Sequence, residues 1–268
     1  EAALDAAGTS SVPRHLALSI ILACLVTACV PSETPPATVA TASPASDTSI
    51  PAARWRAVLI AGDSSSPAFN NGVETMRDRL QSEGVRDIRV LAADPANLAG
   101  AEVASVPNVR RALQSLGGPP QGGGACIAFL TSHGEQSGFF LRASRTLLSP
   151  SSLEQALDAG CGSLPTVLIV SACHSGTFLT AQSQKSNRII FTAAATDRTS
   201  FGCGANDEYT NFDRCLLRSL DGAVTWRELA VTTRSCVEAS ERRLNVRQAS
   251  LPQLFVGASV AGLRLPGR

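Results

Sequence analysis

The sequence predicts an α/β domain built on a largely parallel sheet, and three patterns carry that prediction. From Trp55 onward, short apolar runs alternate with stretches of helical periodicity, as they do in successive β-α-β units. The runs at residues 126–131 and 166–170 are apolar throughout, which is typical of strands covered by helices on both faces. With 44% hydrophobic and 17% charged residues, the composition favours a packed core over a disordered chain.

The expected elements follow one another in a simple order. Strands are expected at residues 56–61, 88–92, 126–131, 166–170, 188–192 and 253–260, and helices at residues 73–83, 104–116 and 226–244. A hairpin is expected around residues 139–142, and residues 117–124 read as a loop. Another helix opens at Ser149, a good N-cap with Pro150 in the first turn. We find no internal repeat and expect one domain over residues 54–268.

The N-terminal segment has the pattern of an export signal. Arg14 and His15 precede an apolar run at residues 16–28, which ends in small residues directly before Cys29. The run is short for a membrane span, which takes about 20 apolar residues. The pattern resembles a bacterial lipobox, in which Cys29 is acylated and becomes the new N-terminus. Cys24 is a second candidate, and cleavage by ordinary signal peptidase is the alternative.

Residues 30–53 are dominated by Pro, Ser, Thr and Ala, a composition that suits a solvated tether. We therefore expect a signal peptide over residues 1–28, lipidated Cys29 and its tether over residues 29–53, and a location in the bacterial cell envelope, periplasmic or at the outer membrane. Nucleic acid is not an expected partner, because 23 Lys and Arg against 22 Asp and Glu leave a net charge of +1.

The chain has eight cysteines. Cys24 and Cys29 lie in the leader region, and Cys173 is treated below. The other five are Cys126, Cys161, Cys203, Cys215 and Cys236. An exported protein can hold disulfides, and since five is an odd number, at least one of these thiols stays free. The pairing is not determined by the sequence.

Two polar features stand at the carboxyl ends of the two most apolar strands. His133 and Gly134 follow the first, and Cys173 and His174 follow the second. Because ligands of open α/β sheets bind at the carboxyl ends of strands, neighbouring strands would hold His133 and Cys173 across one crevice. A cysteine nucleophile needs an acid–base group to manage the thiol proton and protonate the leaving amine, and histidine does this at neutral pH.

Gly134 and the neighbouring residues complete the predicted site. Gly134 leaves room for substrate backbone, and its N–H could join the Cys173 N–H in an oxyanion hole, with each donor worth about 3–4 kcal/mol. His174 is a poor base for its neighbour, because successive side chains of extended backbone point opposite ways. The third histidine, His15, lies in the leader, so His133 is the predicted partner of Cys173.

An apolar strand ending in His-Gly, followed by one ending in Ala-Cys-x-Ser-Gly, resembles the legumain (asparaginyl endopeptidase) family of the caspase-like clan of cysteine peptidases. Similar downstream motifs are Thr192-Ala193-Ala194, Ser200-Phe201-Gly202-Cys203 and Asp207-Glu208. The resemblance covers most of residues 55–260. It implies a caspase-like three-layer sandwich with a mostly parallel sheet, and endopeptidase or transpeptidase chemistry through a Cys173 thioester.

The specificity pocket departs from the family pattern. Legumains usually have a glutamate two residues before the nucleophile, in the pocket that selects asparagine, and this chain has Ser171 there. The other S1 candidates implied by the resemblance are Ser200 and Asp213, with Asp207 and Glu208 nearby. An acidic pocket would favour Arg or Lys at P1, whereas the alternative interpretation of these acids is a solvated loop. Asn71 is a candidate for the family's histidine-orienting asparagine.

Three other functions are alternatives to a cysteine endopeptidase. Residues 61–64 resemble the nucleophile block of GDS-type esterases, but those enzymes need a late histidine and none follows His174, so Ser64 is expected to cap the turn. A zinc site of Cys173, His174 and Cys203 lacks the spacing of known fingers or ribbons. A catalytically silent lipoprotein binding module is the remaining alternative. The favoured hypothesis is an endopeptidase for peptide or protein substrates, held at the membrane by its lipid, with no cofactor and no metal ion.

Overall fold

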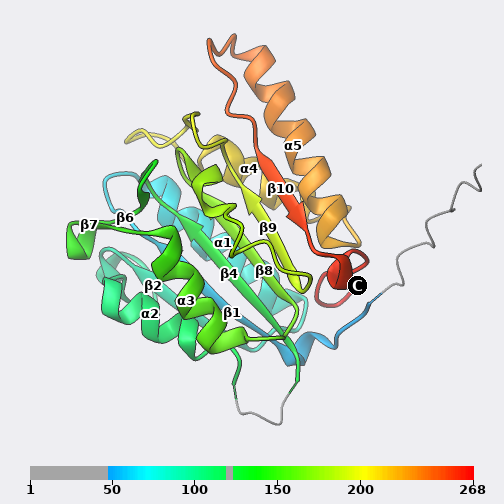
Figure 1. The fold of residues 1–268 in the computed structure, drawn as a ribbon. Coiled ribbons are helices and arrows are strands. Elements are labelled where there is room, and N and C mark those ends of the chain that lie inside the picture. The colour runs from blue at the N-terminus through cyan, green and yellow to red at the C-terminus, as the bar shows by residue number, and fades with distance from the viewer. Residues whose placement is uncertain (1–47, 119–122) are drawn as a thin grey trace, which may run out of the picture. The chain divides into compact units, whose positions relative to one another are not determined.

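The computed structural model describes residues 48–118 and 123–268. A seven-stranded sheet lies at the centre in the order β10-β9-β8-β4-β1-β2-β3 (Figure 1). Its strands are β1 (Trp55–Ala61), β2 (Asp87–Ala92), β3 (Glu102–Val103), β4 (Ala125–Thr131), β8 (Thr166–Ser171), β9 (Arg188–Thr192) and β10 (Gln253–Val256). All neighbouring strands are parallel except β10, which runs antiparallel to β9. The predicted α/β class with a mostly parallel sheet is therefore confirmed.

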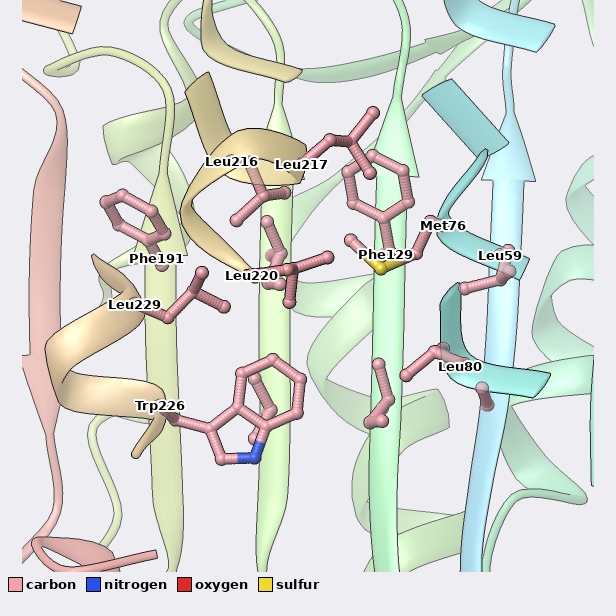
Figure 2. Packing of buried hydrophobic residues seen from close by; sticks show 14 of the residues in the cluster. Leu59, Met76, Leu80, Phe129, Phe191, Leu216, Leu217, Leu220, Trp226 and Leu229 are labelled. Carbon is pink, nitrogen blue, oxygen red and sulfur yellow. The ribbon is translucent and has the colours of Figure 1, made fainter. Parts of the chain in front are cut away.

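Helices cover both faces of the sheet and bury two separate hydrophobic cores. One core is formed with α1 (Pro67–Ser82), α4 (Asn211–Ser219) and α5 (Trp226–Arg243), and the other with α2 (Val106–Gln114) and α3 (Pro150–Cys161). Figure 2 shows the first core, where Trp226, Leu229 and Met76 from the helices lie over Phe129 and Phe191 of the strands. Helices on both faces of a central sheet make a three-layer sandwich.

The strand β4 shows why its sequence had to be apolar throughout. Ile127 and Phe129 belong to the core under α1, α4 and α5, whereas Ala128 and Leu130 belong to the core under α2 and α3. Because side chains alternate between the faces of a strand, a central strand covered on both sides needs apolar residues at every position. Every residue of β4 is accordingly buried.

A smaller antiparallel sheet lies beside the carboxyl ends of the main strands. It consists of β5 (Gly134–Glu135), β6 (Gly138–Leu141) and β7 (Thr146–Leu148), in that order. Phe139 of β6 is fully buried and joins the core under α2 and α3. The hairpin expected around residues 139–142 is thus part of a three-stranded sheet, and it begins immediately after His133.

Short 3₁₀ helices make several of the connections. They are η1 (Ala52–Arg54), η2 (Pro95–Asn97), η3 (Arg142–Ser144), η4 (Ser175–Phe178) and η5 (Ala258–Val260). The helix η5 occupies the end of the range 253–260 that was predicted to be a strand, so the predicted strand is too long. The strand ends at Val256, and the chain then coils into η5, where the N–H of Val260 donates to the carbonyl of Gly257.

Two helix assignments also needed correction. Helix α1 begins at Pro67, six residues before the predicted start, with Ser66 as its N-cap. Asn70, Asn71 and Gly72 have low helix propensity and hid this first turn. Helix α4 was not predicted, although Thr210 caps it and its apolar residues recur at helical spacing.

The segment before β1 lies against the domain. The N–H of Thr48 donates to the carbonyl of Gly262 and the N–H of Arg264 donates to the carbonyl of Thr48, both at 3.0 Å. The Trp55 indole N–H also donates to the carbonyl of Ile50. Residues 48–53 were expected in the tether, and their backbone is instead bonded to the folded domain. The predicted signal peptide, both lipobox cysteines and residues 30–47 lie outside the described residues.

Two disulfides are present, one between the sheet and a helix and one between two neighbouring helices. Cys126 of β4 pairs with Cys161 of α3, and Cys215 of α4 pairs with Cys236 of α5. Cys203 stays free, as the odd number of candidate cysteines required, and so does Cys173. None of the helices in residues 48–118 and 123–268 is long and apolar enough to cross a membrane.

Candidate active site

The sheet brings His133 and Cys173 to one pocket. Strands β4 and β8 are neighbours in register, with Thr131 opposite Ser171, so both site residues lie two positions beyond a paired strand end. The pocket is lined by Phe69, Ser132, His133, Ser171, Ala172, Cys173, Ser200, Phe201, Cys203 and Thr210. This is the position at the carboxyl ends of the strands where an open α/β sheet binds its ligand.

The His133 imidazole is held from three sides. The Ser65 hydroxyl lies 3.3 Å from Nε2, and the Cys203 thiol lies 3.9 Å from Nδ1. The ring of Phe69 meets the imidazole in a T-shaped contact, with the ring centroids 5.2 Å apart. Polar contacts at both nitrogens and an aromatic contact fix the plane of the imidazole, as an acid–base group requires.

The Cys173 thiol faces the backbone of Ser200. The sulfur donates to the Ser200 carbonyl and accepts from the Ser200 N–H, at 3.3 Å in each case. Among the residues that the structure describes, the Cys173 amide N–H has no hydrogen-bond partner. An unpaired N–H next to a nucleophile can donate to an oxyanion.

His174 turns away from its neighbour. Its backbone is left-handed, with a φ of 57°, a conformation in which histidine is enriched among non-glycine residues. Its Nδ1 lies 2.8 Å from the carbonyl of Thr196, and its N–H donates to the carbonyl of Arg198. The side chain is therefore engaged away from Cys173, which leaves His133 as the histidine of the pocket.

His133 and Cys173 share the pocket without a hydrogen bond between them: the ring nitrogens contact Ser65 and Cys203, and the thiol contacts Ser200. Catalytic hydrogen bonds are often long in unliganded enzymes and shorten when substrate binds.

Gly134 is required by a close approach of two backbone segments. A Cβ at this position would lie 2.5 Å from the carbonyl oxygen of Cys173 and 2.9 Å from the Cβ of Ala172. Any larger residue would therefore push the loop after β4 away from the loop after β8. The glycine sets the distance between His133 and Cys173.

The loop between β1 and α1 supports His133, a role that no sequence pattern predicted. The buried Asp63 carboxylate accepts from the guanidinium of Arg142 at 2.8 Å and from the N–H of Ser65. Burial by itself would raise the pKa of Asp63, but the hydrogen bonds from Arg142 and Ser65 outweigh it and lower the pKa. An ionised Asp63 thus holds the loop that presents Ser65 to the imidazole.

Two expectations for this region are corrected. The serine that caps α1 is Ser66, whose hydroxyl accepts from the N–H of Ala68, whereas Ser64 is exposed. Asn71 does not orient His133, because its side-chain amide donates to the carbonyl of Glu208. Consecutive serines made it impossible to tell from sequence which hydroxyl faces the site.

The five predicted S1 residues separate into two groups. Ser171 and Ser200 line the pocket together with Thr210. Asp207, Glu208 and Asp213 do not: Asp207 accepts from the N–H of Gly204, Glu208 is exposed, and Asp213 is fully buried. The pocket wall on this side therefore carries hydroxyl groups and no carboxylate.

Asp213 lies behind that wall. Its carboxylate accepts from the Thr131 hydroxyl at 2.7 Å, and its N–H donates to the hydroxyl of Thr210, which in turn lies 3.3 Å from the Ser171 hydroxyl. One carboxylate oxygen has no partner among the described residues. Burial raises the pKa of Asp213 to about 6, against the opposing effect of these hydrogen bonds.

This carboxyl is expected to make stability fall as pH rises. Because the folded protein binds the Asp213 proton more tightly than the unfolded chain, the free energy of unfolding should drop between pH 4 and pH 6, by an amount on the order of 2–3 kcal/mol. Asp213→Asn should remove that drop. Urea unfolding at several pH values, with Glu208→Gln as an exposed control, would reveal it. If the free energy of unfolding of Asp213→Asn depends on pH in the same way as that of the unmodified protein, the pKa of Asp213 is not raised by folding.

Cys203 is the second free thiol of the pocket. Burial, followed by the nearby Cys173 and Asp207, raises the pKa of the Cys203 thiol. It is thus held in the neutral form, which is the poor nucleophile. Over the described residues, no group of three or more His, Cys, Asp and Glu side chains is arranged to hold a metal ion.

Two comparisons with known proteins agree with this description. A model of the Peptidase C13 family matches residues 125–225, a region that contains both His133 and Cys173. Among solved structures, caspase-1 from Spodoptera frugiperda matches with a TM-score of 0.56, covering 76% of this chain and 86% of that chain at 13% sequence identity. No curated protein matches the sequence.

The fold is that of the caspase-like peptidases, as predicted. The family model then confirms the predicted resemblance to the legumain family, the C13 peptidases, over the part of the chain that builds the pocket. Family and fold together support a cysteine-peptidase type of function acting on protein substrates.

Proposed function

We propose that this protein is a cysteine endopeptidase in which Cys173 is the nucleophile and His133 is the acid–base group. One observation carries the proposal: the two residues come from the ends of adjacent strands and line one pocket, with a Cys173 N–H beside the thiol that is unpaired among the described residues. A peptide carbonyl fits that arrangement, because it needs a nucleophile on one side and a proton donor for its amine on the other.

The proposed reaction follows from these positions. The Cys173 sulfur, having given up its proton to His133, attacks the peptide carbonyl, and the oxyanion is held by the Cys173 and Gly134 N–H groups. His133 then returns the proton to the departing amine as the C–N bond breaks, which leaves a thioester on Cys173. Water, deprotonated by His133, hydrolyses the thioester and regenerates the thiol. Attack by a peptide amine in place of water would make the enzyme a transpeptidase.

Labelling of the thiol tests the proposal directly. The full chain is incubated with peptidyl acyloxymethyl ketones, which form a thioether with an activated cysteine and release a carboxylate, and the product is analysed by mass spectrometry. We expect a single adduct on Cys173 that is absent from Cys173→Ala, with Cys203 unmodified because its raised pKa keeps it neutral. If the folded protein gives no adduct with a probe of any P1 residue, the peptidase proposal is wrong, and the catalytically silent binding module becomes the favoured function.

The same probes address specificity. The wall formed by Ser171, Ser200 and Thr210 offers hydroxyl groups and no carboxylate. A P1 arginine would bury an unpaired guanidinium there, whereas an asparagine amide would find hydrogen-bond partners. We therefore expect the P1-Asn probe to label Cys173 about tenfold faster or more than the P1-Arg probe. Faster labelling by P1-Arg would mean that a carboxylate such as Asp213 becomes accessible when substrate binds.

Ser65 is proposed as a positioning residue for His133. Removing its hydroxyl in Ser65→Ala should lower kcat/KM for a peptide substrate about three- to tenfold, the loss of one hydrogen bond to the ring, and should shift the pH profile governed by His133. Ser64→Ala, at the exposed neighbouring hydroxyl, is the matched control and should leave both unchanged. Equal effects of the two changes would remove Ser65 from the mechanism.

The serines also allow the esterase alternative to be tested. An esterase that used Ser64 would lose ester hydrolysis in Ser64→Ala and keep it in Cys173→Ala. We expect the reverse, because the Cys173 thiol shares the pocket with His133 while Ser64 points to solvent at an exposed position. A phosphonate that reacts with serine and spares Cys173 would give the same answer by mass spectrometry.

We further propose that the protein is exported and anchored in the bacterial cell envelope through a lipid on Cys29. The support is the sequence pattern before Cys29, together with the two disulfides, which form in oxidising compartments. Expressed in bacteria with a palmitate analogue, the full chain should carry label and sediment with membranes. Cys29→Ser should lose both, whereas Cys24→Ser should lose neither. If only Cys24→Ser loses the label and the sedimentation with membranes, the lipid is attached to Cys24.

A further inference from the structure

A groove between α4 and α5 lies outside the catalytic pocket and has no assigned role. The two helices run antiparallel, with Cys215 bonded to Cys236 and the Ser240 hydroxyl donating to the side chain of Asn211 at 2.7 Å. A pocket of about 370 Å³ opens over these contacts. Because a disulfide ties the helices together, the groove is rigid before any ligand arrives, which lowers the entropic cost of binding.

The groove is strongly basic. Arg214 and Arg218 of α4 and Arg243 of α5 line it, and all three are exposed. No Asp or Glu lines the groove, and none of the three guanidinium groups forms an ion pair with the described residues. Elsewhere arginines such as Arg89 and Arg142 are paired with carboxylates. Three unpaired arginines around one concave surface are suited to bind carboxylates in pairs of hydrogen bonds.

The groove also begins next to the catalytic pocket. Thr210 lines the pocket, and the following residue, Asn211, lines the groove. The N–H of Asn211 donates to the carbonyl of Phe201, which belongs to the pocket wall. The pocket and the groove are therefore neighbours at the start of α4.

We propose that the α4–α5 groove is a docking site for an acidic segment of the protein substrate, a proposal that rests on the peptidase function above. The face of α4 from Asn211 to Arg218 is about 10 Å long, which matches about three extended residues. The preferred occupant is therefore a short run of Asp or Glu, located outside the residues around the scissile bond. Its carboxylates pair with Arg214, Arg218 and Arg243.

Binding of acidic peptides to the full chain tests the groove. A fluorescein-labelled hexaglutamate should raise its anisotropy on binding, hexaglutamine should not, and added salt should weaken the complex. The triple change Arg214→Gln, Arg218→Gln, Arg243→Gln should weaken binding roughly tenfold. The matched control is Arg227→Gln, Arg242→Gln, Arg247→Gln, which removes the same charge from exposed arginines that do not line the groove and should change binding less than about twofold.

Equal weakening in both triple variants would overturn the proposal, since net charge and not the groove would then hold the peptide. Tighter binding of single-stranded DNA or of anionic phospholipid vesicles than of hexaglutamate would overturn the choice of occupant. Labelling of Cys173 by the ketone probe, run on the same samples, separates the two proposals. In the groove variants, the ketone probe should label Cys173 at the normal rate. If the unmodified protein binds hexaglutamate but Cys173 is not labelled, the peptidase proposal is wrong, and the groove still binds acidic peptides.

Discussion

Replacing His133 with asparagine is expected to lower kcat/KM for a peptide substrate by about a thousandfold, within the usual range for loss of a positioned acid–base group. The imidazole is the acid–base side chain of the pocket, and Ser65, Cys203 and Phe69 already fix its orientation. The fall in kcat/KM should be largest for an amide substrate, because its amine leaves only when protonated. A p-nitrophenyl ester of the same peptide should lose less than the amide, because its leaving group departs without a proton, although the thiol and water steps still use the imidazole.

The matched control is His174→Asn. His174 adjoins Cys173, but its ring contacts the carbonyl of Thr196, and asparagine tolerates the left-handed backbone at this position. Its kcat/KM should stay within about twofold of the unmodified protein. If the His174 change were the more damaging one, or if amide and ester hydrolysis fell equally in His133→Asn, the assignment of His133 as the proton donor would be wrong.

The second large effect is expected at Gly134. An alanine Cβ would lie 2.5 Å from the carbonyl oxygen of Cys173, so the loops after β4 and β8 must separate. Overpacking of this kind costs about 2 kcal/mol or more, which corresponds to a fall in Tm of about 4–8 °C. Moving His133 by about 1 Å from Cys173 should also slow ketone labelling about a hundredfold.

Gly222→Ala provides the comparison, because a Cβ there would meet nothing within 4 Å. Its Tm and labelling rate should match those of the unmodified protein. Calorimetry and single-exponential labelling kinetics measure the two quantities on the same preparations. A Gly134→Ala protein that keeps its Tm and labels at the normal rate would show that the two loops can separate without changing the site.

The sequence by itself determined the class of the fold and the candidate pair. In β4, apolar residues at every position identify a strand buried on both faces, a local property that does not depend on distant parts of the chain. His133 and Cys173 follow directly after such strands, and adjacency of β4 and β8 in the sheet was enough to predict that they meet. Ser149 and Pro150 fixed the start of α3 for the same local reason.

Only the tertiary structure decided the partners of these residues. Which of the serines between Asp63 and Pro67 faces His133 depends on the direction of a turn. The ion pair of buried Asp63 with Arg142, far away in the chain, sets that direction. Asp213 carries a residue type that suggested an acidic pocket, yet one turn of α4 places its carboxylate behind Thr210 and Ser171. The residues next to Asp213 in the sequence do not determine how far its side chain lies from the pocket surface.

The cysteines show the same division. Their odd number required a free thiol, which is a matter of counting. That Cys203 is the free one depends on the packing of β4 against α3 and of α4 against α5, which brings the other four together in pairs. The basic groove likewise needs α4 and α5 to lie antiparallel, since Arg214 and Arg243 are 29 positions apart along the chain, counting from 214 to 243. Local periodicity fixes which segments are strands and helices, whereas the packing of those segments fixes which side chains share a site.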